Sequence, residues 1–150
     1  MLLLQRTNNQ NPDLIILVKE LDAYLKITDG NEHEFYNQFN GLDNISYCIV
    51  AYVDGKPAGC GAIKEFDENA MEIKRMYLRP EYRGKSIAEE MITELESWAL
   101  ELGFTRSVLE TGERQVEAVR FYHKMGYELM PNYGQYIGME NSSCFEKQLA

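Results

Sequence analysis

The chain has 150 residues, of which 45% are hydrophobic, and a formal net charge of -9. This length and apolar content predict one compact domain over residues 1–150, and they argue against a disordered chain. The excess of acidic residues opposes binding to a phosphate backbone, so no nucleic-acid partner is expected, and it agrees weakly with a cationic or amine partner. Acidic character also serves solubility alone, and this simpler explanation has the larger weight.

Three cysteines, Cys48, Cys60 and Cys144, are scattered along the chain. Their odd number and wide spacing predict reduced, buried thiols, and no Cys or His spacing is typical of a zinc site. The apolar run at residues 1–4 is too short for a signal peptide or a membrane span. We therefore expect a cytoplasmic protein with no metal and no membrane partner, and a homodimer is the usual assembly of such domains.

The first part of the chain is predicted to be helical. In residues 11–26, apolar side chains recur at a helical period after an Asn-Pro-Asp start that suits a helix N-terminus. A shorter helix is expected over residues 32–39, after the turn signal at residues 29–31. The positions of the first helix that should face the core are Leu14, Leu17, Val18, Leu21 and Leu25.

Three β-rich runs come next. Residues 46–53 and 57–66 are joined by Asp54-Gly55, a strong short hairpin signal, so an antiparallel pair is expected. Residues 71–78 are bounded by turn residues on both sides. They should extend the same antiparallel meander.

A helical period returns after Ser86, and Gly103 supplies its stop. The remaining predicted elements are a buried strand at residues 104–110, a helix at residues 115–125, and strands at residues 127–130 and 144–149. Together the elements predict an α+β domain around one mixed sheet. The unit from residue 71 to residue 110 should be a right-handed parallel crossover, with ligands near the carboxyl ends of its strands.

The segment at residues 79–88 joins the third strand of the meander to the next helix and contains three cations. Backbone N–H groups at a helix N-terminus attract anions, and Gly84 lets the backbone come close to a diphosphate beside Arg83. An ordinary helix start is an equal alternative, because Ser86 and Glu89 have the spacing of a capping box. Taken alone, the loop favours neither an anion-binding site nor an ordinary helix start.

Two motifs around this loop resemble the GCN5-related N-acetyltransferase (GNAT) family. Residues 72–80, followed by RGKSIA at residues 83–88, look like the family's central strand and its loop of pattern Gln/Arg-x-x-Gly-x-Gly/Ala. Residues 115–127, QVEAVRFYHKMGY, resemble the second signature, Asn-x-x-Ala-x-x-Phe-Tyr-x-Lys-x-Gly-Phe. The resemblance covers most of the chain. Ser86 and Gln115 depart from it, where the family commonly has glycine and asparagine.

The resemblance implies the GNAT acyl-CoA N-acyltransferase fold, a mixed and mostly antiparallel sheet flanked by helices, with a splayed parallel strand pair. It implies acetyl-CoA as co-substrate, and transfer of the acetyl group to an amine by direct attack in a ternary complex. A small-molecule acceptor is favoured. The residues implied to bind acetyl-CoA are Met76, whose N–H would face the thioester oxygen, Tyr77, Leu78, Arg83, Gly84, Lys85, Ser86, Ile87, Ala88 and Gln115.

The same resemblance implies catalytic roles for Tyr122 and Glu72, and Glu110 competes with Glu72 because it ends the neighbouring strand, where ligands gather. Tyr122 matches the tyrosine that many members use to protonate the departing sulfur, and a phenol with a pKa of about 10 remains a donor at neutral pH. Without the motif, a core position would be favoured for this aromatic. Glu72 and Glu110 are alternative general bases, and either can instead be paired with Lys74 or Arg75.

Two other functions stay open. A non-catalytic acyl-CoA-binding sensor, or a partner-binding module, would use the same fold and the same cofactor residues. A nucleotide-binding protein would use the loop for ATP or GTP, although the loop lacks the glycine spacing of known nucleotide motifs. Residues 131–139 are rich in turn residues and aromatics, and they either line the acceptor pocket or form an ordinary loop.

Overall fold

The computed structural model describes residues 1–29, 42–112 and 115–150. The strands are β1 (Leu2–Thr7), β2 (Tyr47–Val53), β3 (Lys56–Glu65), β4 (Ala70–Leu78), β5 (Arg106–Gly112), β6 (Glu128–Met130) and β7 (Ser142–Gln148). The helices that matter here are α1 (Pro12–Asp29), α3 (Ile87–Glu101) and α4 (Val116–Lys124). Across these described residues the strands form one seven-stranded sheet, in the order β1-β2-β3-β4-β5-β7-β6, with β4 and β5 as its parallel pair. The predicted α+β class and mixed sheet are confirmed.

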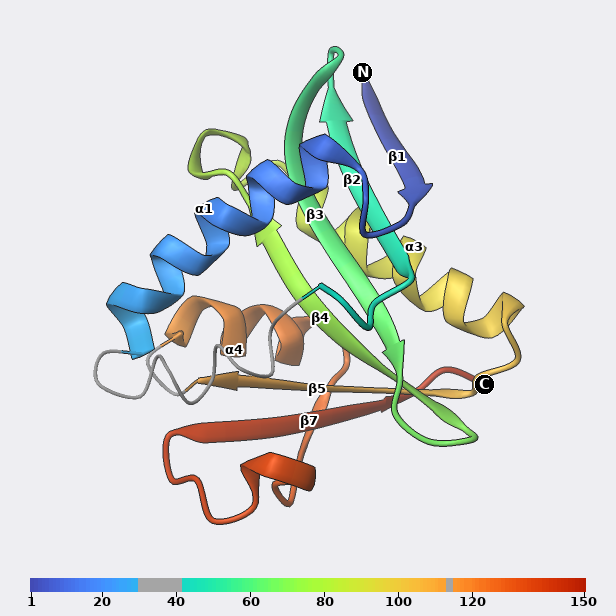
Figure 1. The fold of residues 1–150 in the computed structure, drawn as a ribbon. Coiled ribbons are helices and arrows are strands. Elements are labelled where there is room, and N and C mark those ends of the chain that lie inside the picture. Colours follow the sequence, from blue (N-terminus) through green and yellow to red (C-terminus); the bar gives the residue numbers. More distant parts are fainter. Residues whose placement is uncertain (30–41, 113–114) are drawn as a thin grey trace.

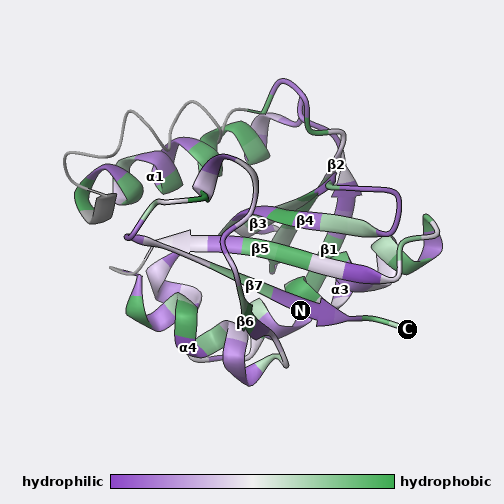
Figure 2. Ribbon diagram, turned by 90° about the horizontal axis from the view of Figure 1, so that it is seen from below, coloured by the Kyte–Doolittle hydropathy of each residue, from purple (hydrophilic) through white to green (hydrophobic). Residues whose placement is uncertain are grey.

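Helices cover both faces of the sheet. α1 lies on one face, with α3 and α4 on the other (Figure 1), and Figure 2 shows α1 and α4 on opposite sides of the strands. Alternate residues of β2 serve the two cores: Ile49 and Ala51 pack with α3, whereas Cys48 and Val50 pack with α1. Strands buried on both faces read as continuous apolar runs, which explains why this strand was readily predicted.

The first helix begins and packs as its sequence predicts. The Asn11 side chain accepts hydrogen bonds from the backbone N–H groups of Asp13 and Leu14, at 2.8 and 3.2 Å, and so caps the helix. All five apolar positions expected to face the core are buried. The helix predicted over residues 32–39 lies outside the described residues. No helix in the described ranges combines the length and hydropathy of a membrane span.

The edge strand β1 was not predicted. It pairs antiparallel with β2, and its Leu2 and Leu4 pack against the core under α3. Arg6, on the same side, donates to Glu94 and Glu101 of α3 at 2.6 Å each. The run of three leucines that opens this strand lacks the strict alternation of apolar and polar residues that marks a half-buried strand, so its pattern was ambiguous.

A bulge bends the second half of β4. Two residues of β4, Arg75 and Met76, oppose the single residue Gly61 of β3, and Arg75 has a left-handed φ of 56°. A Cβ at position 61 would lie 2.7 Å from the Met76 sulfur, so glycine permits this close approach. Because a bulge increases twist and redirects a strand, it helps to turn the end of β4 away from β5.

Two arginines fasten this part of β4 to α1. Arg75 is buried and donates to the Asp22 carboxylate. Arg79 follows the strand and donates through Nε and Nη2 to Glu20, at 3.0 and 2.7 Å, and this pairing lowers the pKa of Glu20. Such bidentate pairs are strong. One of the three cations in the loop at residues 79–88 is therefore already engaged by a carboxylate.

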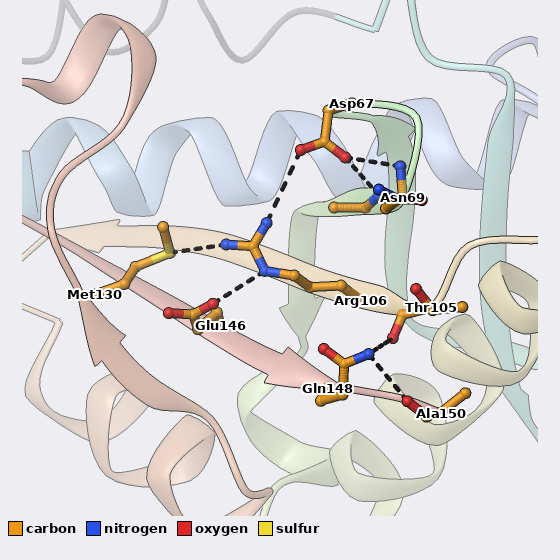
Figure 3. A network of polar contacts seen from close by, with 9 residues as sticks. Asp67, Asn69, Thr105, Arg106, Met130, Glu146, Gln148 and Ala150 are labelled. Carbon is orange, nitrogen blue, oxygen red and sulfur yellow. Dashed lines mark hydrogen bonds and ion pairs between the residues drawn. The ribbon is translucent and has the colours of Figure 1, made fainter.

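The parallel pair is closed at one end and open at the other. β4 and β5 pair over Ala70–Glu72 and Arg106–Val108, which confirms the predicted parallel pairing. At this closed end, Arg106 donates to Glu146 of β7 at 3.0 Å, and its guanidinium lies 4.0 Å from Asp67 in the turn before β4 (Figure 3). Beyond it the two strands diverge, and β5 continues along β7 (Figure 1).

Candidate active site

A hollow that we call the polar cavity opens where β4 and β5 diverge, and its volume is about 100 Å³. It lies between α1, the two strands and α4. The cavity contains both carboxylates that the sequence proposes as bases, together with a lysine. It is lined by Leu21, Leu25, Glu72, Ile73, Lys74, Arg75, Met76, Leu109, Glu110, Thr111, Gly112, Gln115, Ala118, Tyr122 and Tyr136.

A second hollow, the apolar groove, has a volume of about 240 Å³ and runs between the end of β4, the start of α3 and α4. It is lined by Leu21, Tyr24, Met76, Tyr77, Leu78, Arg83, Ala88, Met91, Gln115, Glu117, Ala118, Phe121 and Tyr122. Five of these residues, Met76 and Tyr122 among them, also line the polar cavity. A molecule in the groove can therefore meet a molecule in the cavity.

Tyr122 stands at this junction. Its side chain is only 7% exposed, and the rings of Phe121 and Tyr127 pack edge-on against it at centroid distances of 5.3 and 5.8 Å. Burial raises the pKa of the Tyr122 phenol above its ordinary value, because the charged phenolate is disfavoured away from water. The hydroxyl therefore keeps its proton at neutral and moderately alkaline pH, as a proton donor between two bound molecules must.

Glu72 is buried in the polar cavity and is held by two donors. The Tyr133 hydroxyl donates to its Oε2 at 2.7 Å, and Lys74 Nζ lies 3.5 Å from its Oε1. Burial first, and the negative charge of Glu72 second, raise the pKa of Tyr133, so that hydroxyl remains a donor. Both oxygens of Glu72 thus have partners within the protein.

Glu110 lines the cavity from the neighbouring strand β5 and is half-buried. Burial, followed by the charges of Glu110 and Glu72, raises the pKa of Tyr136. Tyr136 and Tyr133 both belong to the segment at residues 131–139, so this segment does contribute to the walls around the two carboxylates. The sequence left open whether this segment lines a pocket or forms an ordinary loop, and it could not single out these two tyrosines.

The helix α3 begins without a side-chain cap. Ser86 adopts a left-handed φ of 63° and, among the described residues, makes no capping hydrogen bond, while Glu89 accepts a hydrogen bond from Lys124 at 3.1 Å. The capping box expected of Ser86 and Glu89 is therefore wrong. Its failure leaves the first N–H groups of α3 without a side-chain acceptor, next to a turn in which Gly84 has a φ of 79°. Such a turn suits an anion.

Residues 16–127 match the model of the acetyltransferase (GNAT) family. The chain belongs to the GNAT family. The match includes β4, the turn before α3, β5 and Tyr122, and so most of the candidate site; Tyr133 and Tyr136 lie beyond it. It confirms the resemblance seen in the sequence, and the diverging pair of β4 and β5 is the splayed pair that the resemblance implies.

Individual proteins with acetyltransferase or acyltransferase names are similar to this chain in sequence or in fold. The IAA acetyltransferase of Azospirillum brasilense is 31% identical over 139 residues, which are 91% of this chain and 90% of that protein. A crystal structure from Klebsiella pneumoniae, provisionally assigned as an acyl-CoA N-acyltransferase, is 26% identical with a TM-score of 0.84 and covers 100% of this chain and 99% of its own. A GNAT acetyltransferase of Elizabethkingia anophelis, with acetyl-CoA bound, has the same fold at 16% identity, with a TM-score of 0.72 and coverage of 99% and 98%.

The structure brings most of the predicted cofactor residues of this GNAT protein together. Those that line the apolar groove are Met76, Tyr77, Leu78, Arg83, Ala88 and Gln115. Gly84, Lys85 and Ser86 form the exposed turn at its end. Ile87 differs from the expectation, because its side chain is buried in the core beneath α3 and only its backbone faces the turn.

Lys74 is a charged cavity residue that the sequence did not identify as part of the site. From the sequence it was expected only as a counter-ion for a glutamate, yet its side chain is 7% exposed and lines the polar cavity. Its spacing from Glu72 could have identified it. Lys74 follows Glu72 by two residues in a strand, and this spacing places both side chains on the same face.

Proposed function

We propose that this chain is an acetyl-CoA-dependent N-acetyltransferase that acetylates the amine of a small molecule while both substrates are bound. The observation that carries the proposal is the junction of the polar cavity and the apolar groove at Met76 and Tyr122. Direct transfer needs an elongated site for the thioester arm and a separate site for the amine, which meet at one point. The Elizabethkingia anophelis relative, which has this fold, binds acetyl-CoA.

The apolar groove fits the arm of the cofactor. In the described part of the chain, β5 does not pair with β4 beyond Glu72, so backbone groups at this edge can bind the amides of a pantetheine arm. Leu78, Ala88 and Phe121 supply apolar walls. At the far end, the uncapped N-terminus of α3 and the Arg83 guanidinium suit the diphosphate.

Acetyl-CoA, when bound, supplies an activated acetyl group and a thiol leaving group. We assign the Met76 backbone N–H to the thioester oxygen, where it stabilises the negative charge that develops as the amine attacks. Tyr122 is assigned as the acid that protonates the departing sulfur. Its burial supports this role, because the phenol enters the reaction with its proton in place.

Glu110 is the carboxylate that we assign as base for the amine proton. Glu72 is the alternative base, and Tyr133 and Lys74 hold it in the same cavity. Glu110 reaches the same cavity from the other strand, and together the two carboxylates attract the amine in its cationic form. The amine attacks after it has lost one proton to solvent, and Glu110 accepts the second proton, directly or through a water molecule, as the bond to the acetyl carbon forms.

The test measures thiol release from acetyl-CoA with a panel of small primary amines that includes free amino acids. The proposal predicts release that depends on the amine, with an equal amount of acetylated amine detected by mass spectrometry. A non-catalytic sensor would bind coenzyme A in titration calorimetry and release no thiol with any amine. A nucleotide-binding protein would bind ATP in preference to coenzyme A, and either result would overturn the proposal.

A further inference from the structure

Lys74 is a cation with a side chain only 7% exposed, and the proposed reaction alone gives it no role. Among the described residues its ammonium has one partner, Glu72, at 3.5 Å. This is long for a charge-assisted hydrogen bond, for which about 2.7–2.9 Å is usual. The Tyr133 hydroxyl holds the same carboxylate more closely, at 2.7 Å. Since a buried ammonium with poor partners is costly, a ligand that brings an anionic group to Lys74 would be favoured.

Lys74 and Glu110 occupy equivalent positions on β4 and β5, each two residues beyond the last aligned pair. Glu72 is aligned with Val108, and two residues further along each parallel strand stand Lys74 and Glu110. Aligned residues of parallel strands project to the same face of the sheet, and both side chains do line the polar cavity. The cavity therefore has an ammonium on one strand and a carboxylate on the other.

The charges of the cavity are mixed. Glu72 and Glu110 contribute two carboxylates, while Lys74 and Arg75 contribute two cations. Arg75 is directed to α1, where it donates to Asp22, so Lys74 is the cation that the cavity can offer to a ligand. A plain alkylamine would satisfy the carboxylates and would repel Lys74. A molecule with both an amine and an anionic group complements both strands.

The size and depth of the cavity limit this molecule. Its volume is about 100 Å³, several times the ~10–15 Å³ that one water molecule needs, and this suits a small molecule. Lys74 precedes Met76 by two residues, and the bulge at Arg75 makes their separation along the strand shorter than the ~7 Å of two regular extended residues. A small amino acid can span that distance from the reacting end to Lys74.

We propose that the acceptor is a small amino acid whose carboxylate binds Lys74 and whose amine lies towards Glu110 and Tyr122. This inference rests on the proposed N-acetyltransferase function and adds a substrate class to it. Lys74 is then a residue that determines specificity, through an ion pair with the substrate. An ammonium is a point charge without the planar fork of arginine, so it selects for charge more than for shape.

The test compares amino acids with their primary amides as acceptors, because the amide keeps the amine and the side chain but has no carboxylate. In Lys74→Met, kcat/KM for an amino acid should fall about 10- to 150-fold more than kcat/KM for the matching amide, the range expected for a lost charged hydrogen bond. Most of the loss should appear in KM. Lys74→Arg should recover part of it, since the charge is kept.

Tyr133→Phe is the matched control. It removes the close partner of Glu72 and keeps Lys74, so kcat/KM for acids and for amides should change by the same factor. Lys74→Gln serves as a second variant, and thermal unfolding shows that each variant is folded.

Equal losses for acids and amides in both Lys74 variants would show that Lys74 acts only through Glu72, and would overturn the inference. A wild-type preference for amines without a carboxylate would also overturn it, with the proposed function intact. Absence of thiol release with every amine would instead overturn the proposed function, and this inference with it.

Discussion

The two ends of the β4–β5 pair differ in the burial and pairing of their charged side chains. At the closed end, Arg106 reaches Glu146 of β7 across the strands (Figure 3), and the carboxylates around it are 41–48% exposed. At the open end, Glu72 and Lys74 are less than a tenth exposed and share one long contact, with Glu110 on the facing strand. Half-exposed ion pairs are inexpensive, whereas buried charges need close partners.

From this difference we expect the two ends to have different roles. The closed end has its hydrogen bonds completed within the chain, because strand pairing and the Arg106 contacts satisfy it. At the open end β4 and β5 do not pair with each other in the described part of the chain, and ionisable groups gather around Tyr122, which is the arrangement expected where a ligand completes a site. Changes at the closed end should therefore alter stability, and changes at the open end should alter chemistry.

Tyr122→Phe should have the largest effect. Loss of the acid should lower kcat about 10²- to 10⁴-fold, with little change in coenzyme A affinity by calorimetry. Folding should be retained, because the hydroxyl makes no hydrogen bond to the described residues. Tyr127→Phe is the matched control, since its buried hydroxyl bonds Glu96 and Ser107 at 2.9 and 2.8 Å; it should reduce stability and preserve kcat. Wild-type kcat in Tyr122→Phe would show that another group protonates the sulfur.

The second largest expected effect is that of pH on kcat/KM. The rate should rise about tenfold per pH unit below the pKa of the acceptor amine, because only the neutral amine attacks, and should then level. Tyr122 acts while protonated, and burial raises its pKa, so no falling limb is expected below about pH 10. Near-ultraviolet circular dichroism checks that the fold is intact. A falling limb near neutrality would contradict Tyr122 as the acid, and a flat profile would contradict rate-limiting attack by the neutral amine.

Arg106→Met should affect stability alone. The substitution keeps the apolar packing of the stem and removes the ion pair with Glu146, so the free energy of unfolding should fall by about 1 kcal/mol. For a chain of this length that corresponds to a decrease of about 2–4 °C in Tm. A double-mutant cycle with Glu146→Gln isolates the pair. A large loss of kcat in the folded variant would show that the closed end also controls chemistry.

Local sequence signals were sufficient for most of the fold. The apolar period of α1, the Asp54-Gly55 hairpin and the helix stops at Gly103 and Gly126, with φ of 96° and 94°, all appear as expected. Each depends on neighbours within a few positions of the chain. The strand β1 was missed because its place is set by pairing with β2, about 45 residues later, and its own pattern is ambiguous.

In the candidate site, too, local sequence signals predict the residues but not the contacts between distant segments. The motifs identified Glu72 and Tyr122, the predicted strand end identified Glu110, and all three line one hollow. What the sequence could not give are the contacts between distant segments. Arg79 is held by Glu20 of α1, and Glu72 is held by Tyr133, 61 residues away. These contacts decide which charges in the cavity and the loop remain for a ligand.

Ser86→Gly should have the smallest effect, at the turn that we assign to the diphosphate. Ser86 has a φ of 63°, a conformation that costs a residue with a side chain about 1–2 kcal/mol, while glycine loses about 0.5–1 kcal/mol through the entropy of its unfolded chain. The free energy of unfolding should therefore rise by about 0.5–1 kcal/mol, measured by denaturant titration.

Ser86→Ala separates the two parts of this effect, because it removes the hydroxyl and keeps the unfavourable backbone conformation. The hydroxyl caps nothing among the described residues, so Ser86→Ala should be no more stable than the wild type. Both variants should bind coenzyme A as the wild type does, because the assignment gives the diphosphate to backbone N–H groups and Arg83. Weaker binding in both variants would show that the hydroxyl itself contacts phosphate, and the departure from the family's glycine would then serve cofactor binding at the open end.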